Sequence, residues 1–189
     1  MLKYFLFILL VFPLSCFSQE EKVFTSLEAA RLQPENVTVL KLKRKGFKEF
    51  PWEILMFTNL RSLDLSSNKL QKIPGEIGRL QKLEVLNLSN NKIERLPESI
   101  GDLKNLEELD LNRNELTSLP KTIGKLIYLQ ELILWSNNID TLPDEIAELD
   151  GSLELLDMRS IRMNTEKQRI IKLLLPNVKK KFDQPCNCY

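Results

Sequence analysis

Two acidic residues are the only pair in the chain whose types and spacing suggest catalysis. Glu108 and Glu131 occupy the same place in two successive copies of a 23-residue repeat, so they are expected side by side on adjacent strands. Paired carboxylates carry out acid–base chemistry in glycoside hydrolysis. Both belong on an open, solvated sheet, where nothing is expected to raise a pKa. We therefore predict that the pair is not catalytic.

The chain lacks the residues that other common kinds of catalysis require. The chain has no histidine, which removes Ser-His and Cys-His nucleophiles and the usual zinc enzymes. It also has no glycine-rich phosphate loop. Cys186 and Cys188 fall short of four metal ligands and are expected to form a small disulfide or to remain free thiols. The sequence predicts no enzyme, no metal and no cofactor.

The feature that organises the chain is its period. Prolines recur every 23 residues, at Pro51, Pro74, Pro97, Pro120 and Pro143. Around them returns the frame L-x-x-L-x-L-x-x-N-x-L-x-x-L-P-x-x-I-x-x-L, starting at Leu60, Leu83, Leu106 and Leu129. Degenerate copies start at Val37, with Lys45 at the asparagine position, and at Leu153, with Ile161 there. Such a period indicates stacked units that bury a shared core.

One copy predicts the local structure of all six. Leu109 and Leu111 alternate with polar residues, as in a half-buried strand. Strands are therefore expected near 39–43, 62–66, 85–89, 108–112, 131–135 and 155–159. After the strands, the asparagines are expected to stack and bond to the backbone of neighbouring copies: Asn68, Asn91, Asn114 and Asn137. A further column is expected to have room for small residues only: Gly78, Gly101, Gly124 and Ala147.

This frame resembles the leucine-rich repeat family, in the 23-residue class of the Ras-suppressor type and its bacterial relatives. The resemblance covers residues 37–163. It implies an α/β solenoid with about six parallel strands on a concave face and short helical or irregular turns on the convex face. It also implies a role in binding rather than in catalysis.

Both ends of the stack carry capping signals. Residues 19–36 form an expected N-terminal cap, with a capping box at Thr25–Glu28 before a short helix that ends ahead of Pro34. Residues 164–189 form an expected C-terminal cap and tail, with a second box at Thr165–Gln168 and a helix that ends before Pro176. A last edge strand is expected within residues 178–182.

Residues 1–18 have the pattern of a signal peptide. Lys3 precedes an apolar run too short for a comfortable membrane span, and a small-x-small site ends at Ser18. We favour cleavage before Gln19 and export to the periplasm, the cell surface or the medium. The alternatives are lipid attachment at Cys16, which would tie the protein to a membrane, and an uncleaved anchor.

The charge of the chain is balanced. It has 27 basic and 26 acidic residues, and loss of Lys3 with the signal peptide brings the net charge from +1 to 0. Neither nucleic acid nor an anionic membrane is therefore an expected partner.

The fifth copy breaks the polar pattern of the strand face. Serine, aspartate and asparagine fill most outward positions of earlier copies, whereas Ile133 and Trp135 fill them here. Large apolar residues on open surfaces mark sites where partners bind. We predict a protein or peptide site made by Trp135, Ile133, Arg159, Asn112 and Glu131. The alternative is that Trp135 lies flat under Arg159 as a packed surface pair.

Three functions fit these features. The favoured one is an exported, non-enzymatic module that binds a protein or peptide on its concave strand face. The second is a structural or adhesive surface protein, and the third is an intracellular scaffold, against which the signal-like segment argues.

Overall fold

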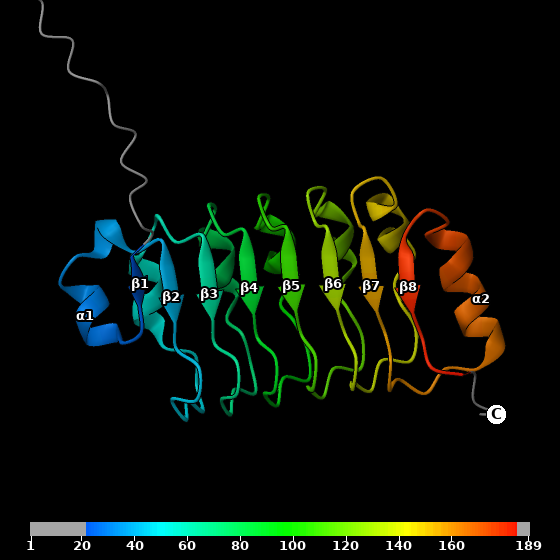
Figure 1. Ribbon diagram of the computed structural model, residues 1–189, viewed down its shortest axis with the longest axis horizontal. Helices are drawn as coiled ribbons and strands as arrows, with labels where there is room; N and C mark the ends of the chain where they lie inside the picture. Colours follow the sequence, from blue (N-terminus) through cyan, green and yellow to red (C-terminus); the bar gives the residue numbers. More distant parts are fainter. Residues whose placement is uncertain (1–21, 185–189) are drawn as a thin grey trace, which may run out of the picture.

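In the computed structural model, residues 22–184 are described, and within them eight short strands form one parallel sheet in chain order (Figure 1). The strands are β1 (Val23–Phe24), β2 (Val39–Lys41), β3 (Ser62–Asp64), β4 (Val85–Asn87), β5 (Glu108–Asp110), β6 (Glu131–Ile133), β7 (Leu155–Asp157) and β8 (Lys179–Lys181). The sheet is open, and each strand pairs only with its sequence neighbours. The predicted solenoid is confirmed.

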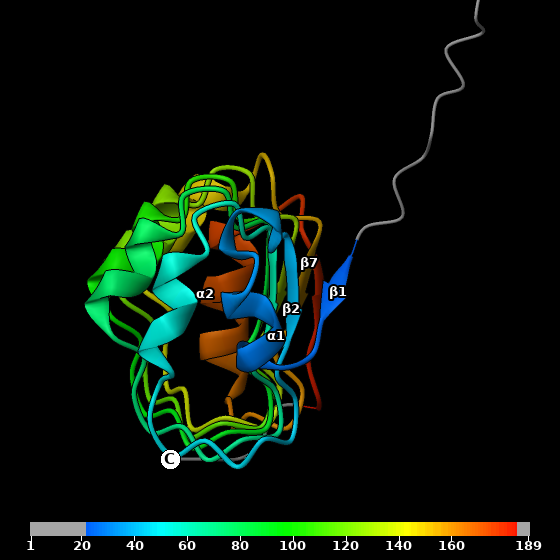
Figure 2. The ribbon, with the colours of Figure 1, turned by 90° about the vertical axis from the view of Figure 1, so that its left-hand side faces the viewer.

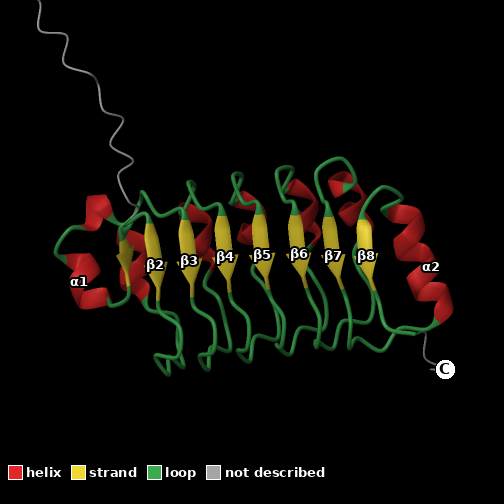
Figure 3. Ribbon diagram, viewed as in Figure 1, coloured by secondary structure: helices red, strands yellow, loops and turns green. Residues whose placement is uncertain are grey.

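A row of 3-10 helices lies opposite the strands, behind the sheet (Figures 2 and 3). These are η2 (Trp52–Met56), η3 (Gly75–Arg79), η4 (Glu98–Asp102), η5 (Lys121–Lys125) and η6 (Asp144–Leu149), while η1 (Pro34–Asn36) precedes β2. A proline stands at the N-cap of each helix from η2 to η6. Its fixed φ starts the turn at the same place in every copy.

The core is one continuous column of leucine and isoleucine between the sheet and these helices. Leu86 and Leu88 are fully buried while Asn87 and Ser89 stay partly exposed, as the alternation predicted. The small-residue column is also explained. A Cβ on Gly124 would come within 2.3 Å of the Glu145 carbonyl oxygen, so adjacent 3-10 helices pack backbone against backbone there.

The asparagine ladder stabilises the chain directly after strands β3 to β6. The Asn114 Oδ1 accepts the Ile93 N–H at 3.0 Å, and its Nδ2 donates to the Leu88 and Leu111 carbonyls at 3.0 Å. Each of these carbonyls also accepts from the amide of an adjacent copy, Asn91 or Asn137. The amides therefore join successive copies through backbone groups that would otherwise be buried without partners.

The two ends are covered as expected, with small corrections. Helix α1 (Leu27–Arg31) is capped by Ser26 rather than Thr25, and α2 (Thr165–Leu174) by Asn164 rather than Thr165. In each case a neighbouring capping residue was available one position earlier or later. Strand β8 is the expected edge strand, whereas β1 was not foreseen because only two residues pair with Val39 and Leu40.

Candidate functional site

The candidate site lies on the strand face, which we define as the outward side of β2 to β8. The outward residues come from the third, fifth and seventh positions of each copy, and the register places equivalent positions side by side. Most are partly exposed, but Ser66 is only 2% exposed. The outward position of this serine therefore does not make it exposed, and Asp157 on β7 is equally buried.

Ile133 and Trp135 are the large apolar residues at the fifth and seventh positions of this surface, and both are partly exposed, as are Val85 and Leu155 at the third position of their copies. Ile133 lies between Asp110 and Asp157 on the flanking strands. One step further along, the Trp135 carbonyl accepts the Arg113 N–H at 2.9 Å. The two residues thus form an apolar strip among carboxylates and amides.

Arg113, which the sequence prediction missed, covers the ring of Trp135 at 4.8 Å from guanidinium carbon to ring centroid. Arg113 has a positive φ of 52°, as do the residues at this position in the other five copies. This left-handed turn directs the side chain back over the next strand. The missed signal was the residue type: four of the six copies carry serine or asparagine at this turn, whereas arginine appears here and at Arg44.

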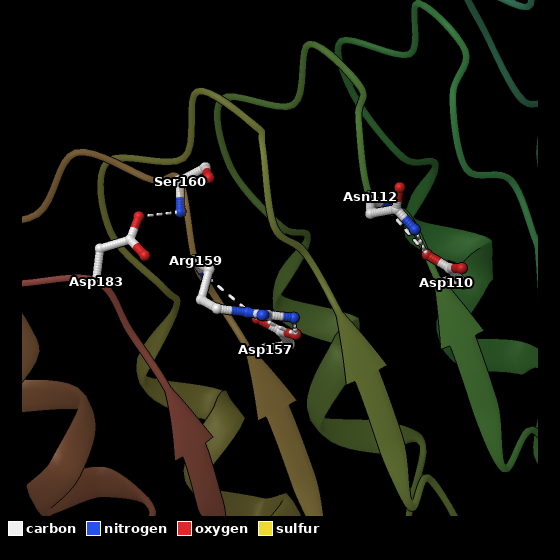
Figure 4. A network of polar contacts seen from close by, with 6 residues as sticks. All are labelled: Asp110, Asn112, Asp157, Arg159, Ser160 and Asp183. Atoms are coloured by element: carbon white, nitrogen blue, oxygen red, sulfur yellow. Dashed lines mark hydrogen bonds and ion pairs between the residues drawn. The ribbon is translucent and has the colours of Figure 1, made fainter.

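Arg159 does not stack on Trp135 as the alternative prediction required. Its side chain folds onto Asp157 instead, with Nε to Oδ1 at 3.0 Å and Nη2 to Oδ2 at 2.6 Å (Figure 4). Asp157 is 2% exposed. Burial opposes its ionisation, but the hydrogen bonds from Arg159 outweigh this, and the pKa of Asp157 lies below its usual value. Arg159 therefore serves first to neutralise a buried carboxylate.

Asp110 and Asn112 form a second polar pair on the same face (Figure 4). The Asp110 Oδ1 accepts from the Asn112 backbone N–H at 3.0 Å and from its Nδ2 at 2.6 Å. Partial burial raises the pKa of Asp110 despite these bonds, and the charges of Asp64 and Asp157 add to the effect. The expectation that nothing on this sheet raises a pKa was thus wrong at one position.

Glu131 stands beside Glu108 on the neighbouring strand, as the repeat predicted, and both side chains are exposed. Over β4 to β6 lies a hollow of about 130 Å³, and its lining includes Val85, Asn87, Glu108, Asp110, Glu131 and Ile133. It has the size of a side-chain end rather than of a substrate cavity. Of the predicted site residues, Ile133, Trp135, Asn112 and Glu131 are brought together, whereas Arg159 is engaged by Asp157.

Residues 22–184 contain neither a metal-ligand cluster nor a membrane-spanning helix. No group of three or more histidine, cysteine, aspartate or glutamate side chains could hold a metal ion there. None of the helices in this part of the chain has the length and apolar character to cross a bilayer. Cys16, Cys186 and Cys188 lie outside the described residues, as does the predicted signal segment 1–18.

The fold of this chain is similar to that of solved repeat proteins. A leucine-rich repeat protein of Leptospira interrogans is 35% identical over 85% of this chain and 48% of its own, with a TM-score of 0.67. The Arabidopsis thaliana receptor kinase ectodomain GASSHO1/SCHENGEN3, solved in complex with CASPARIAN STRIP INTEGRITY FACTOR 2, is 32% identical over 86% of this chain and 20% of its own, with a TM-score of 0.68.

The plant peptide hormone receptor RGFR1, solved with RGF2, is 28% identical over 85% of this chain and 26% of its own, with a TM-score of 0.67. The chain thus spans half or less of the length of these proteins. Among curated proteins, none matches the chain significantly. The model of the leucine-rich repeat region family matches residues 35–175, which is most of the chain. With its 23-residue frame, asparagine ladder and open parallel sheet, this chain belongs to the leucine-rich repeat family.

Proposed function

We propose that this chain is an exported, non-enzymatic module that binds a protein or peptide on its strand face, over β5 to β7. The observation that carries the proposal is the strip of Ile133 and Trp135, two partly exposed apolar side chains in columns that are otherwise mostly polar. Burying an indole desolvates a large rigid surface at low entropic cost. Two similar structures were solved in complexes, one with CASPARIAN STRIP INTEGRITY FACTOR 2 and the other with RGF2, which supports a binding role.

The residues of the site would contribute to binding in different ways. Ile133 and Trp135 supply the apolar contact, and Arg113 holds one side of the indole by a cation–π contact. Glu131 and Asn112 offer polar groups at the margin of the strip. Arg159 keeps Asp157 neutralised and its exposed half contributes to the rim.

A displayed library of random twelve-residue peptides, selected on the purified chain, tests this site. The control is built into the chain, because Trp52 is a second tryptophan, 54% exposed and on η2 rather than on the strand face. Selected peptides should lose binding to the Trp135→Ala variant and keep it for Trp52→Ala. Equal binding to both variants would leave the strip a structural feature and favour an adhesive or structural protein.

Export is tested separately by sequencing the N-terminus of the protein from its host. We expect it to start at Gln19 and to be found outside the cytoplasm. A lipid-bearing Cys16 would favour membrane attachment, and an intact Met1 in the cytoplasm would favour a scaffold.

A further inference from the structure

Charge is divided along the strand face, although the chain as a whole is nearly neutral. Basic residues mark its two ends, with Lys41 and Lys43 on and after β2 and Lys179 and Lys181 on β8. The middle is acidic, with Glu108, Asp110 and Glu131 on β5 and β6 of the face itself, and Glu107 and Glu154 at the residues directly before β5 and β7. Within residues 22–184, none of these five carboxylates forms an ion pair, whereas Glu84 beside them pairs with Arg61 at 3.3 Å.

In the absence of a partner, the carboxylates on β5 and β6 are in an electrostatically unfavourable arrangement. Glu108 and Glu131 are directly opposite on adjacent strands, and like charges in that position repel. Asp110 lies on the same strand as Glu108, is partly desolvated and has its pKa raised by that burial. A cation placed between them would remove the repulsion and gain charge-assisted hydrogen bonds.

The surface between these groups is shaped for the end of a long side chain. The hollow of about 130 Å³ has Glu108 and Glu131 on one side and the apolar side chains of Val85 and Ile133 nearby. Lysine and arginine carry an apolar stem below a charged head. Such a side chain matches a hollow that combines an apolar lining with carboxylates, and the Ile133–Trp135 strip continues beside it.

We infer that the partner of the strand face is a basic segment of a protein or peptide, which places a lysine or arginine side chain between Glu108 and Glu131 and packs an adjacent apolar side chain on Ile133 and Trp135. This inference rests on the proposed function and adds the chemistry of the partner to it. Arginine is favoured over lysine because its planar guanidinium can bond two carboxylates at once. Polyanionic partners are repelled by the same carboxylates.

The test uses the twelve-residue peptide library and a pair of charge-neutral variants. Peptides selected on the wild-type chain should be enriched in arginine and lysine and depleted in aspartate and glutamate. The Glu108→Gln/Glu131→Gln variant keeps the shape of both side chains and should bind the strongest selected peptide at least tenfold more weakly. The matched control is Glu98→Gln/Glu148→Gln, which removes two exposed carboxylates on η4 and η6. It should bind like the wild type.

Salt and a substituted peptide complete the design. Raising sodium chloride from 50 to 500 mM should weaken binding to the wild type more than binding to Glu108→Gln/Glu131→Gln, since the variant lacks two of the charges whose attraction to the peptide is screened. Replacing each arginine of the peptide by neutral citrulline should weaken binding to the wild type alone.

The outcomes separate the two proposals. Peptides that require Trp135 but show no preference for basic residues, or that bind Glu108→Gln/Glu131→Gln with unchanged affinity, would overturn the inference and leave the binding strip standing. Failure to select any peptide that distinguishes Trp135→Ala from the wild type would overturn both.

Discussion

Replacing Asn114 by alanine should destabilise the solenoid far more than the loss of one polar side chain suggests. Asn114 is 7% exposed, and its amide bonds four backbone groups of two copies: the Ile93 N–H and the Leu88, Leu111 and Asn112 carbonyls. Its removal leaves the Ile93 N–H buried without its acceptor, whereas the Leu88 and Leu111 carbonyls each retain one donor from the neighbouring ladder amide. The Asn112 carbonyl likewise keeps the Asn90 N–H as its donor, so the variant has one buried donor without a partner and three acceptors with one bond fewer.

These losses set the expected magnitude. A buried group left without a partner costs about 1–3 kcal/mol, and a lost hydrogen bond whose acceptor keeps another partner costs about 0.5–1.5 kcal/mol. Because the site can relax, we expect Asn114→Ala to lower the free energy of unfolding by about 2–4 kcal/mol. The amide hydrogen of Ile93 should also exchange faster in the native state, since its acceptor is gone.

Urea unfolding followed by circular dichroism measures this loss. Asn105 is the matched control, because its side chain is exposed and donates a single bond, at 2.7 Å, to the Gln81 carbonyl. Asn105→Ala should cost less than about 1 kcal/mol. If Asn114→Ala costs no more than Asn105→Ala, the ladder is not what joins the copies, and the account of the fold is refuted.

Three further results are expected. Leu109→Ala, at a fully buried position, should cost about 2–5 kcal/mol in urea unfolding and should speed amide exchange in adjacent copies as well. Arg159→Ala should lower the melting temperature at pH 7, because it leaves Asp157 buried and unpaired. The folded-state pKa of Asp157 in the wild type is depressed, so the stability that its ion pair with Arg159 contributes is present above the unfolded pKa of about 3.9. This contribution disappears as the pH falls through the lower folded-state pKa, and the difference between variant and wild type should shrink with it. Asp110→Asn should raise the melting temperature at pH 7, because ionising a carboxyl whose folded-state pKa is raised costs folding stability as the pH rises. This gain in melting temperature should vanish below about pH 4, where Asp110 is neutral in both the folded and the unfolded protein.

The repeat itself was predictable because each set of equivalent positions in successive copies meets a single physical requirement. Leucines at alternating strand positions, a stacked amide after the strands of the four central copies and a small residue where helices touch are all local requirements that recur every 23 residues. Gly124 illustrates the point, since the Glu145 backbone leaves no room for a Cβ. Such requirements can be inferred from the pattern without knowing the fold.

The candidate site was predictable only in part, because several of its side chains have more than one possible bonding partner and the sequence does not determine which partner is used. Trp135 could be assigned to the surface from the alternation, but the choice of Arg113 over Arg159 as its neighbour depends on a left-handed turn and on the buried Asp157. The capping shifts to Ser26 and Asn164 have a similar cause, since a second capping residue stood next to each predicted one.

The central claim, that the strand face over β5 to β7 binds a protein or peptide, is tested most directly by one affinity measurement. Fluorescence anisotropy of the strongest selected peptide should give a Kd for the wild-type chain, Trp135→Ala and Trp52→Ala. We predict that Trp135→Ala weakens binding by about 2 kcal/mol or more, roughly thirty-fold in Kd, with a melting temperature close to that of the wild type. Trp52→Ala should leave the Kd unchanged. Equal Kd values for the two variants, or a Trp135→Ala variant that loses stability but not affinity, would contradict the claim.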